Sequence, residues 1–327
     1  MRTGKLDWKF MSEIISYLPL DDVDVVLGPS QGEDAAVVRI RDGFLVAHSD
    51  PITTGVKRSG YLAVHVASND IAVRGVKPKW FLPVILLPSG FSESAVKELF
   101  RDMALAMREV EGVAIGGHTE VTPGITRPII NMTVLGFTRT RVILTRDAKV
   151  GDYVYVVGRV GGEGAGIIAW DLEETLLQKK VDRGMIEKAK QYIYEIGVTS
   201  VALRIKDYVN SMHDATEGGV LQAIRELAVA SRGCIKVHRD RIRLESTVEA
   251  ITRAVGVNPL KLLSSGCLVA TVPPAAKKDF ECALEDLKRP YTLVGEVMEG
   301  SGELILLDGT GHEIIRDDIV DEIYKLW

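Results

Sequence analysis

Apolar and polar positions in the first half of the chain alternate between strand-like runs and helix-like stretches. Short apolar runs predict strands at residues 44–50, 80–87, 113–115 and 129–137. Longer stretches predict an amphipathic helix at 8–18, which stops before Pro19, and helices at 59–76 and 92–111. This alternation indicates a mixed sheet with helices on one side.

The pattern restarts at residues 140–152, where a polar segment precedes a new apolar run. We therefore predict two domains, at residues 1–145 and 146–327. In the second domain, strands are predicted at 153–157, 267–272 and 291–297, with a hairpin turn at 308–311. Helices are predicted at 167–178, 217–230 and 274–287, from Glu245 onward, and in segments between 186 and 209. The predicted fold class is α/β (α+β).

Length, composition and charge narrow the class of protein. A chain of 327 residues, 46% hydrophobic and 26% charged, is long for a single core and has enough apolar material for two. Its net charge of −5 argues against a general nucleic-acid binder, which normally presents a basic face. The densest apolar run, 80–87, is too short to span a membrane. Three dispersed cysteines suit a reducing compartment, so we expect a cytoplasmic protein.

Four aspartates stand where a purely structural carboxylate would be costly: Asp34, Asp50, Asp70 and Asp214. Asp70 lies in a helix that is apolar on nearly every face, which is typical of a buried helix. A carboxylate there has to be paired or bound to a metal. The structural alternative is an ion pair between Asp70 and Arg74, and Asp34 and Asp50 taken singly also suit a loop and a turn. As a set, they supply the hard oxygen ligands that magnesium on polyphosphate prefers.

Glycine-bearing segments offer candidate phosphate sites. The turn at 28–32 and the helix start at 216–219 could present backbone amides to anions, although each also suits a plain turn. A third run, 158–166, loosely matches a dinucleotide fingerprint, but the acidic residue that should follow on a second strand is missing. The six histidines show no zinc spacing and Cys267 opens an apolar strand, so we expect these side chains to be mainly structural.

The motifs occur in a specific order: Gly32-Glu33-Asp34-Ala35-Ala36, Ser49-Asp50, Asn69-Asp70 followed by Gly75 and Pro78, Gly116-Gly117-His118-Thr119-Glu120, and His213-Asp214-Ala215-Thr216-Glu217-Gly218-Gly219. In this order they resemble the aminoimidazole ribonucleotide synthetase (PurM-like) superfamily. This group includes the hydrogenase maturation protein HypE, selenophosphate synthetase and thiamin-monophosphate kinase. The resemblance covers nearly the whole chain and is nearest to HypE-like proteins.

The resemblance implies a two-domain fold whose N-terminal domain pairs in a homodimer to form a central β-barrel beside a C-terminal α/β domain. It also implies ATP and Mg²⁺ as cofactors, with the nucleotide near the dimer interface. The implied metal ligands are Asp34, Asp50, Asp70 and Asp214, of which the last three are also catalytic, and Asn69 would orient Asp70 or a phosphate. The implied cofactor-binding set is Gly32, Asp34, Asn69, Gly116, Gly117, His118, Glu120, Thr216, Gly218 and Gly219.

The chain departs from its relatives at two points. His118 stands where relatives carry an acidic residue, so either Glu120 takes over or one metal site is altered. The chain also lacks the C-terminal cysteine on which HypE acts, since it ends Tyr324-Lys325-Leu326-Trp327. We therefore expect an ATP- and Mg²⁺-dependent enzyme that transfers the γ-phosphoryl group to a small molecule or to a group on a partner protein. The alternative is a non-catalytic nucleotide-binding partner in a maturation or assembly complex.

Overall fold

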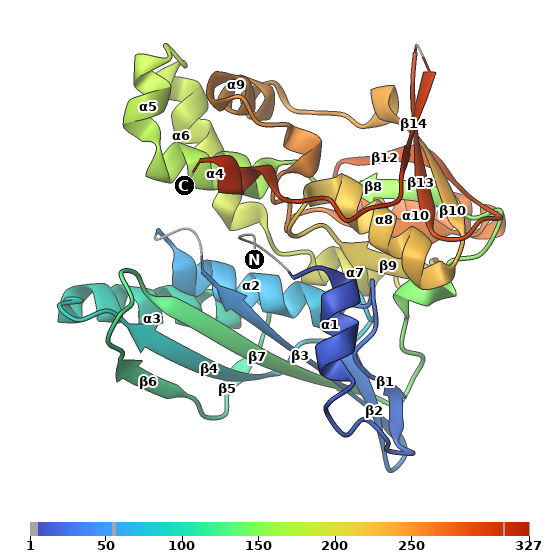
Figure 1. Ribbon diagram of the computed structural model, residues 1–327, viewed down its shortest axis with the longest axis horizontal. Coiled ribbons are helices and arrows are strands. Elements are labelled where there is room, and N and C mark those ends of the chain that lie inside the picture. Colours follow the sequence, from blue (N-terminus) through green and yellow to red (C-terminus); the bar gives the residue numbers. More distant parts are fainter. Residues whose placement is uncertain (1–5, 54–56, 310, 327) are drawn as a thin grey trace.

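The computed structural model describes residues 6–53, 57–309 and 311–326, which form two mixed sheets with helices between and around them (Figure 1). The first sheet has the strand order β1-β2-β3-β7-β4-β5, with β6 pairing β4. Its strands are β1 (Val25–Leu27), β2 (Ala36–Ile40), β3 (Gly43–Ile52), β4 (Trp80–Leu87), β5 (Val113–Ala114), β6 (His118–Val121) and β7 (Ile129–Thr138). Its helices are α1 (Trp8–Ile15), α2 (Ser59–Ala72) and α3 (Glu93–Glu109).

Helix α2 lies in the middle of the molecule, between the first sheet and the second half of the chain (Figure 1). All of its residues are buried, because it packs on β3, β7 and α3 from one domain and on α7 and β9 from the other. This position explains why the sequence has no polar face over 59–72. Polar side chains on α2 therefore need partners inside the protein.

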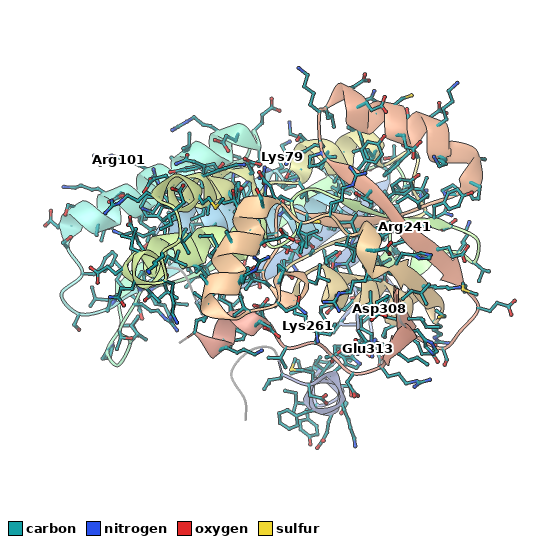
Figure 2. The ribbon with its side chains drawn as sticks, turned by 90° about the horizontal axis from the view of Figure 1, so that it is seen from above. Lys79, Arg101, Arg241, Lys261, Asp308 and Glu313 are labelled. Atoms are coloured by element: carbon teal, nitrogen blue, oxygen red, sulfur yellow. The ribbon has the colours of Figure 1, made fainter. Side chains whose placement is uncertain are left out.

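The second sheet has the order β14-β13-β10-β12-β8-β11-β9. Its strands are β8 (Tyr153–Val157), β9 (Ser211–Asp214), β10 (Cys234–His238), β11 (Leu268–Val272), β12 (Tyr291–Met298), β13 (Glu303–Asp308) and β14 (Gly311–Ile315). Its helices are α4 (Gly162–Asp171), α5 (Glu173–Gln178), α6 (Arg183–Gln191), α7 (Thr199–Ile205), α8 (Gly219–Ser231), α9 (Ser246–Val255) and α10 (Lys277–Asp286). Seen from above, Lys79 and Arg101 lie along one edge, and the β13–β14 hairpin residues Asp308 and Glu313 lie on the other side (Figure 2).

Most predicted elements are present, and the differences have local causes. The helix predicted at 167–178 starts earlier, at Gly162, and breaks at Leu172 into α4 and α5. Five strands were not predicted: β1, β2, β6, β9 and β10. Three of them, β1, β6 and β9, have only three or four residues, and β9 is mostly polar in sequence. No described helix is long and apolar enough to cross a membrane.

The glycine run at 158–166 serves close packing. A Cβ at Gly164 would lie 2.3 Å from Leu262 Cγ, and one at Gly158 would lie 2.3 Å from the carbonyl oxygen of Gly266. Gly158 also has a φ of +110°, which side-chain-bearing residues rarely adopt. Both glycines are therefore explained by contacts between α4, β8 and the 262–266 loop, without a dinucleotide.

Candidate functional site

Asp34 lies just before β2 and is held by a buried arginine from the end of α2. The Arg74 guanidinium donates to Asp34 Oδ2, to Glu33 Oε2 at 2.8 Å and to Thr145 Oγ1 at 2.6 Å. Its side chain is 0% exposed, so these carboxylates balance a charge that has no access to water. The alternative pairing of Arg74 with Asp70 is wrong, because the guanidinium points to the 33–34 loop instead.

His213, at the end of β9, joins the same carboxylate from the second domain. Its Nδ1 lies 3.0 Å from Asp34 Oδ1, and its Nε2 lies 3.1 Å from Glu226 Oε2. Burial alone would lower the pKa of His213, but the two carboxylates raise it well above its usual value. Burial likewise opposes ionisation of Asp34, yet His213 and Arg74 lower the pKa of this carboxyl. A buried ionic network thus joins the two domains.

Ligand atoms of Asp34, His213 and Asp214 lie within 4.8 Å of one another, a spacing that would suit a metal ion. The contacts argue differently, because both Asp34 oxygens already face cationic or hydrogen-bonding nitrogens. The same imidazole Nδ1 is also 2.8 Å from the Asp214 carbonyl oxygen. A metal ion at this position would have to compete with these nitrogen groups for the same carboxylate oxygens.

Asp70 and Asp50 have other neighbours than Asp34, although His48 also acts electrostatically on Asp34. Asp70 Oδ2 is 3.5 Å from His48 Nε2 on β3, and the two side chains are 10% and 22% exposed. Asp50 lies near the end of the same strand and acts electrostatically on Glu163 and Tyr324, so both belong to its surroundings. The sequence did not single out His48 or Glu163, since neither belongs to a recognisable motif.

Further carboxylates gather near Asp50. Glu163 is buried at the start of α4 and accepts hydrogen bonds from Ser265 N at 3.0 Å and Ser265 Oγ at 2.6 Å. Burial raises the pKa of Glu163, and the charges of Asp50 and Glu217 raise it further. The carboxylates of Glu163, Asp50 and Glu217 thus lie close enough to act on one another electrostatically.

Asn69 makes contacts that the sequence did not predict. Its amide nitrogen donates to the carbonyl oxygens of Ile196 and Ser265, each at 2.9 Å, and its oxygen accepts from Val198 N at 2.8 Å. All three bonds reach the backbone of the second domain, and the side chain is fully buried. Asn69 therefore joins the domains, and its orienting of Asp70 or a phosphate stays a prediction.

The segment 116–120 lies away from these residues. It leads into β6, which pairs with β4 at the opposite edge of the first sheet from β2 (Figure 1). His118 and Glu120 are exposed, with His118 Nε2 3.1 Å from Glu120 Oε2. Within one chain, the fold thus does not bring Gly116, Gly117, His118 or Glu120 to the Asp34 network.

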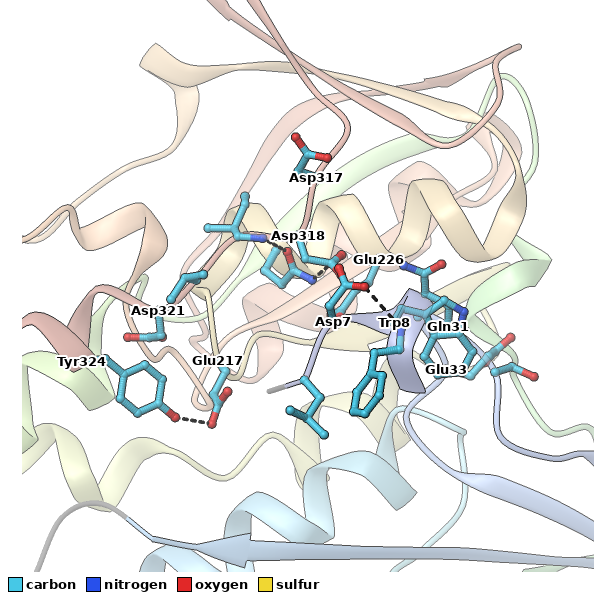
Figure 3. Close-up of a pocket in the computed structure, with 17 residues that line it drawn as sticks. Asp7, Trp8, Gln31, Glu33, Glu217, Glu226, Asp317, Asp318, Asp321 and Tyr324 are labelled. Carbon is cyan, nitrogen blue, oxygen red and sulfur yellow. Dashed lines mark hydrogen bonds between the residues drawn. The ribbon is translucent and has the colours of Figure 1, made fainter. Parts of the chain in front are cut away.

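A cavity of about 790 Å³ opens beside the 30–33 loop (Figure 3). Trp8 and Phe10 of α1 contribute apolar surface, and the predicted Gly32 lies in its wall. Gly32 has a φ of +76°, and a Cβ there would lie 2.5 Å from the Glu226 carbonyl oxygen. Seven acidic residues line the cavity: Asp7, Glu33, Glu217, Glu226, Asp317, Asp318 and Asp321.

The C-terminal segment covers the predicted phosphate-binding turn. Asp321 Oδ2 accepts from Gly218 N at 2.8 Å, and Tyr324 OH donates to Glu217 at 2.7 Å (Figure 3). Burial raises the pKa of Asp321 to about 7, although the hydrogen bonds from the backbone N–H groups of Ile323 and Gly218 act to lower it. The amino end of α8, with Thr216, Gly218 and Gly219 before or at its start, thus already faces a carboxylate from the same chain.

The amino-acid sequence of this chain is similar to those of several known proteins. A protein of Methanocaldococcus jannaschii named for hydrogenase expression and formation is 28% identical over 97% of this chain and 96% of its own length. The carbamoyl dehydratase HypE of Bradyrhizobium diazoefficiens is 26% identical over 76% of this chain and 72% of its own. The thiamine-monophosphate kinase of Pyrococcus horikoshii is 26% identical over 84% and 85%, respectively.

Solved structures share the fold. A HypE–HypF complex superposes with a TM-score of 0.75 at 19% identity, covering 94% of this chain and 99% of that one. HypE in complex with ATP gives 0.69 at 19% identity, covering 96% of each chain. The family models for the N-terminal and C-terminal domains of AIR synthase related protein match residues 32–138 and 149–307. The chain therefore belongs to the AIR synthase related protein family, with its two-domain PurM-like fold, and lies close to HypE-like proteins.

Proposed function

We propose that this protein is an ATP- and Mg²⁺-dependent enzyme that transfers the γ-phosphoryl group to an acceptor and so activates it. The observation that carries this proposal is the convergence of Asp50 and Asp70 on a domain junction beside the cavity walled by Gly32. Relatives named as a dehydratase and a kinase, and a HypE structure with ATP, support ATP use.

Asp50, Asp70 and Asp214 are the proposed catalytic carboxylates. The donors near Asp50 and Asp70 fit a hard divalent cation, because they are carboxylate oxygens whose acidic neighbours, such as Glu163, favour added positive charge. When bound, magnesium neutralises charge on the transferred phosphoryl group. Transfer of this kind depends mainly on positioning, which suits carboxylates fixed on β3, α2 and β9.

A homodimer is part of the proposal. Segment 116–120 lies at the sheet edge away from Asp34, so a second chain is needed to bring a copy of it to the site. Three apolar side chains on this edge are between 53% and 63% exposed: Val113, Ile115 and Val121. A group of exposed apolar side chains on one edge is typical of an interaction surface. Pairing through this edge would bury them and extend the first sheet toward a barrel.

The acceptor is a small molecule or a group on a partner protein. A structure of HypE with HypF supports the second possibility by analogy. The alternative is a nucleotide-binding partner that does not turn ATP over. The exposed His118–Glu120 pair supports this alternative, because His118 stands where relatives carry an acidic residue. Release of ADP in the presence of an acceptor separates the two, because a binding module leaves ATP intact.

Thermal unfolding with and without Mg-ATP tests the proposal. A ligand at about 100 times its Kd adds about 2.7 kcal/mol to the native state, which raises the unfolding midpoint. We expect this rise for the native protein only with magnesium present, and a much smaller one for Asp70→Asn. Equal midpoints with and without Mg-ATP in the native protein would refute the proposal.

A further inference from the structure

We propose that Asp34 is not a metal ligand in this chain, because the Arg74 guanidinium and the His213 ring occupy its two oxygens and form a clamp between the two domains. The inference deepens the proposed function and rests on it, because it restricts the magnesium to the Asp50 and Asp70 side of the site.

The first support is the arginine. Arg74 is fully buried and donates to the Oδ2 atom of Asp34, while Glu33 Oε2 and the Ile143 carbonyl oxygen take other guanidinium hydrogens. A guanidinium keeps its charge at any pH that a folded protein tolerates. Removing it from Asp34 would leave Glu33, among the described residues, as the one carboxylate in contact with this buried cation, which is unfavourable.

The second support is the imidazole. His213 places Nδ1 at 3.0 Å from Asp34 Oδ1 and Nε2 at 3.1 Å from Glu226 Oε2. A metal-bound imidazole needs one nitrogen lone pair directed at the ion. Here each ring nitrogen faces a carboxylate oxygen, so neither is directed at a shared metal position.

Charge balance separates the two sides of the site. Two nitrogen groups hold the two oxygens of Asp34, and a divalent ion placed there would lie against the Arg74 charge. Asp70 instead has an imidazole, His48 Nε2, at 3.5 Å from one oxygen, and Asp50 has the carboxylate of Glu163 in its surroundings. The buried guanidinium therefore disfavours a cation at Asp34 more than beside Asp50 and Asp70.

The clamp also has a mechanical consequence. Asp34 belongs to the first domain, whereas His213 on β9 and Glu226 on α8 belong to the second. Glu33, on the same loop, accepts from the backbone N–H groups of Thr145 and Arg146 at 3.0 and 3.1 Å. The contacts fix the 32–34 loop, and with it one wall of the cavity, against the second domain.

Manganese binding in the presence of a non-hydrolysable ATP analogue tests the inference, with bound Mn²⁺ counted by electron paramagnetic resonance. We expect Asp34→Asn to bind Mn²⁺ within about twofold of the native affinity and with the same number of ions per chain. We expect Asp70→Asn, the matched variant, to lose at least about tenfold. Loss of an ion or of tenfold affinity in Asp34→Asn, or native binding by Asp70→Asn, overturns the inference.

A second variant keeps the test decisive if Asp34→Asn does not fold. Arg74→Met removes the internal cation and leaves Glu33 and Asp34 unbalanced, so Mn²⁺ alone should raise its unfolding midpoint by more than that of the native protein. An equal or smaller rise in Arg74→Met would contradict the counter-cation role. Failure of the proposed function looks different, since the native protein itself would then bind no Mn²⁺ with the nucleotide analogue.

Discussion

Replacing Asn69 with alanine separates a structural role from a ligand-binding one. The substitution removes three hydrogen bonds, two to carbonyl oxygens and one from Val198 N, all within 2.9 Å and all buried. At a net value of about 1 kcal/mol each, and with the backbone partners left unsatisfied, we expect a loss of at least about 3 kcal/mol. Because these bonds cross between domains, the loss should appear in the unfolding of both.

Urea unfolding followed by circular dichroism measures this loss. Asn210→Ala is the matched control, because the side chain of Asn210 donates to Asp152, at 2.9 Å and within the second domain. We expect the control to lose about 1 kcal/mol. If Asn69→Ala unfolds like the native protein but no longer responds to Mg-ATP, then Asn69 acts on the ligand and the structural role is refuted.

Three further predictions follow from single features. Asp321 has a folded pKa of about 7, above its unfolded value, so the stability that it contributes falls as pH rises through 7. The slope of the unfolding free energy is at most about 1.4 kcal/mol per pH unit. Asp321→Asn should flatten this dependence in thermal melts from pH 5.5 to 8.5. Gly32→Ala should lower the midpoint more than Gly90→Ala, since both glycines have positive φ but only Gly32 has an atom, the Glu226 carbonyl oxygen, within 3 Å of the added Cβ; equal losses would contradict this. Val121→Lys, unlike the equally exposed Val150→Lys, should convert a dimer to a monomer in light scattering, and a persistent dimer would reject the edge as the interface.

The buried helix and its aspartate were predictable from sequence because they depend on local pattern. An apolar stretch without a polar face predicted that α2 is buried, and the order of the motifs predicted the family. Asp70 on that helix was therefore recognisable as a costly carboxylate that needs a partner. The strand order that separates segment 116–120 from Asp34 is a long-range property that no local pattern records.

The partners of these residues could not be predicted, since they come from distant parts of the chain. Arg74 reaches back about forty positions to Asp34 rather than four to Asp70, and His213 arrives from the other domain. Helical spacing favours the local pair, but burial of a guanidinium selects whichever carboxylates can surround it. The position of the C-terminal segment at the site was not predicted for the same reason. Asp321 and Tyr324 contact Gly218 and Glu217 only in the folded chain.

Isothermal titration of ATP into the native protein, with magnesium and then with a chelator, tests the central claim most directly. We predict one ATP bound per chain with magnesium, and loss of this binding in the chelator and in Asp70→Asn. Binding of equal strength in the chelator, or none under either condition, would contradict an ATP site built on Asp50 and Asp70.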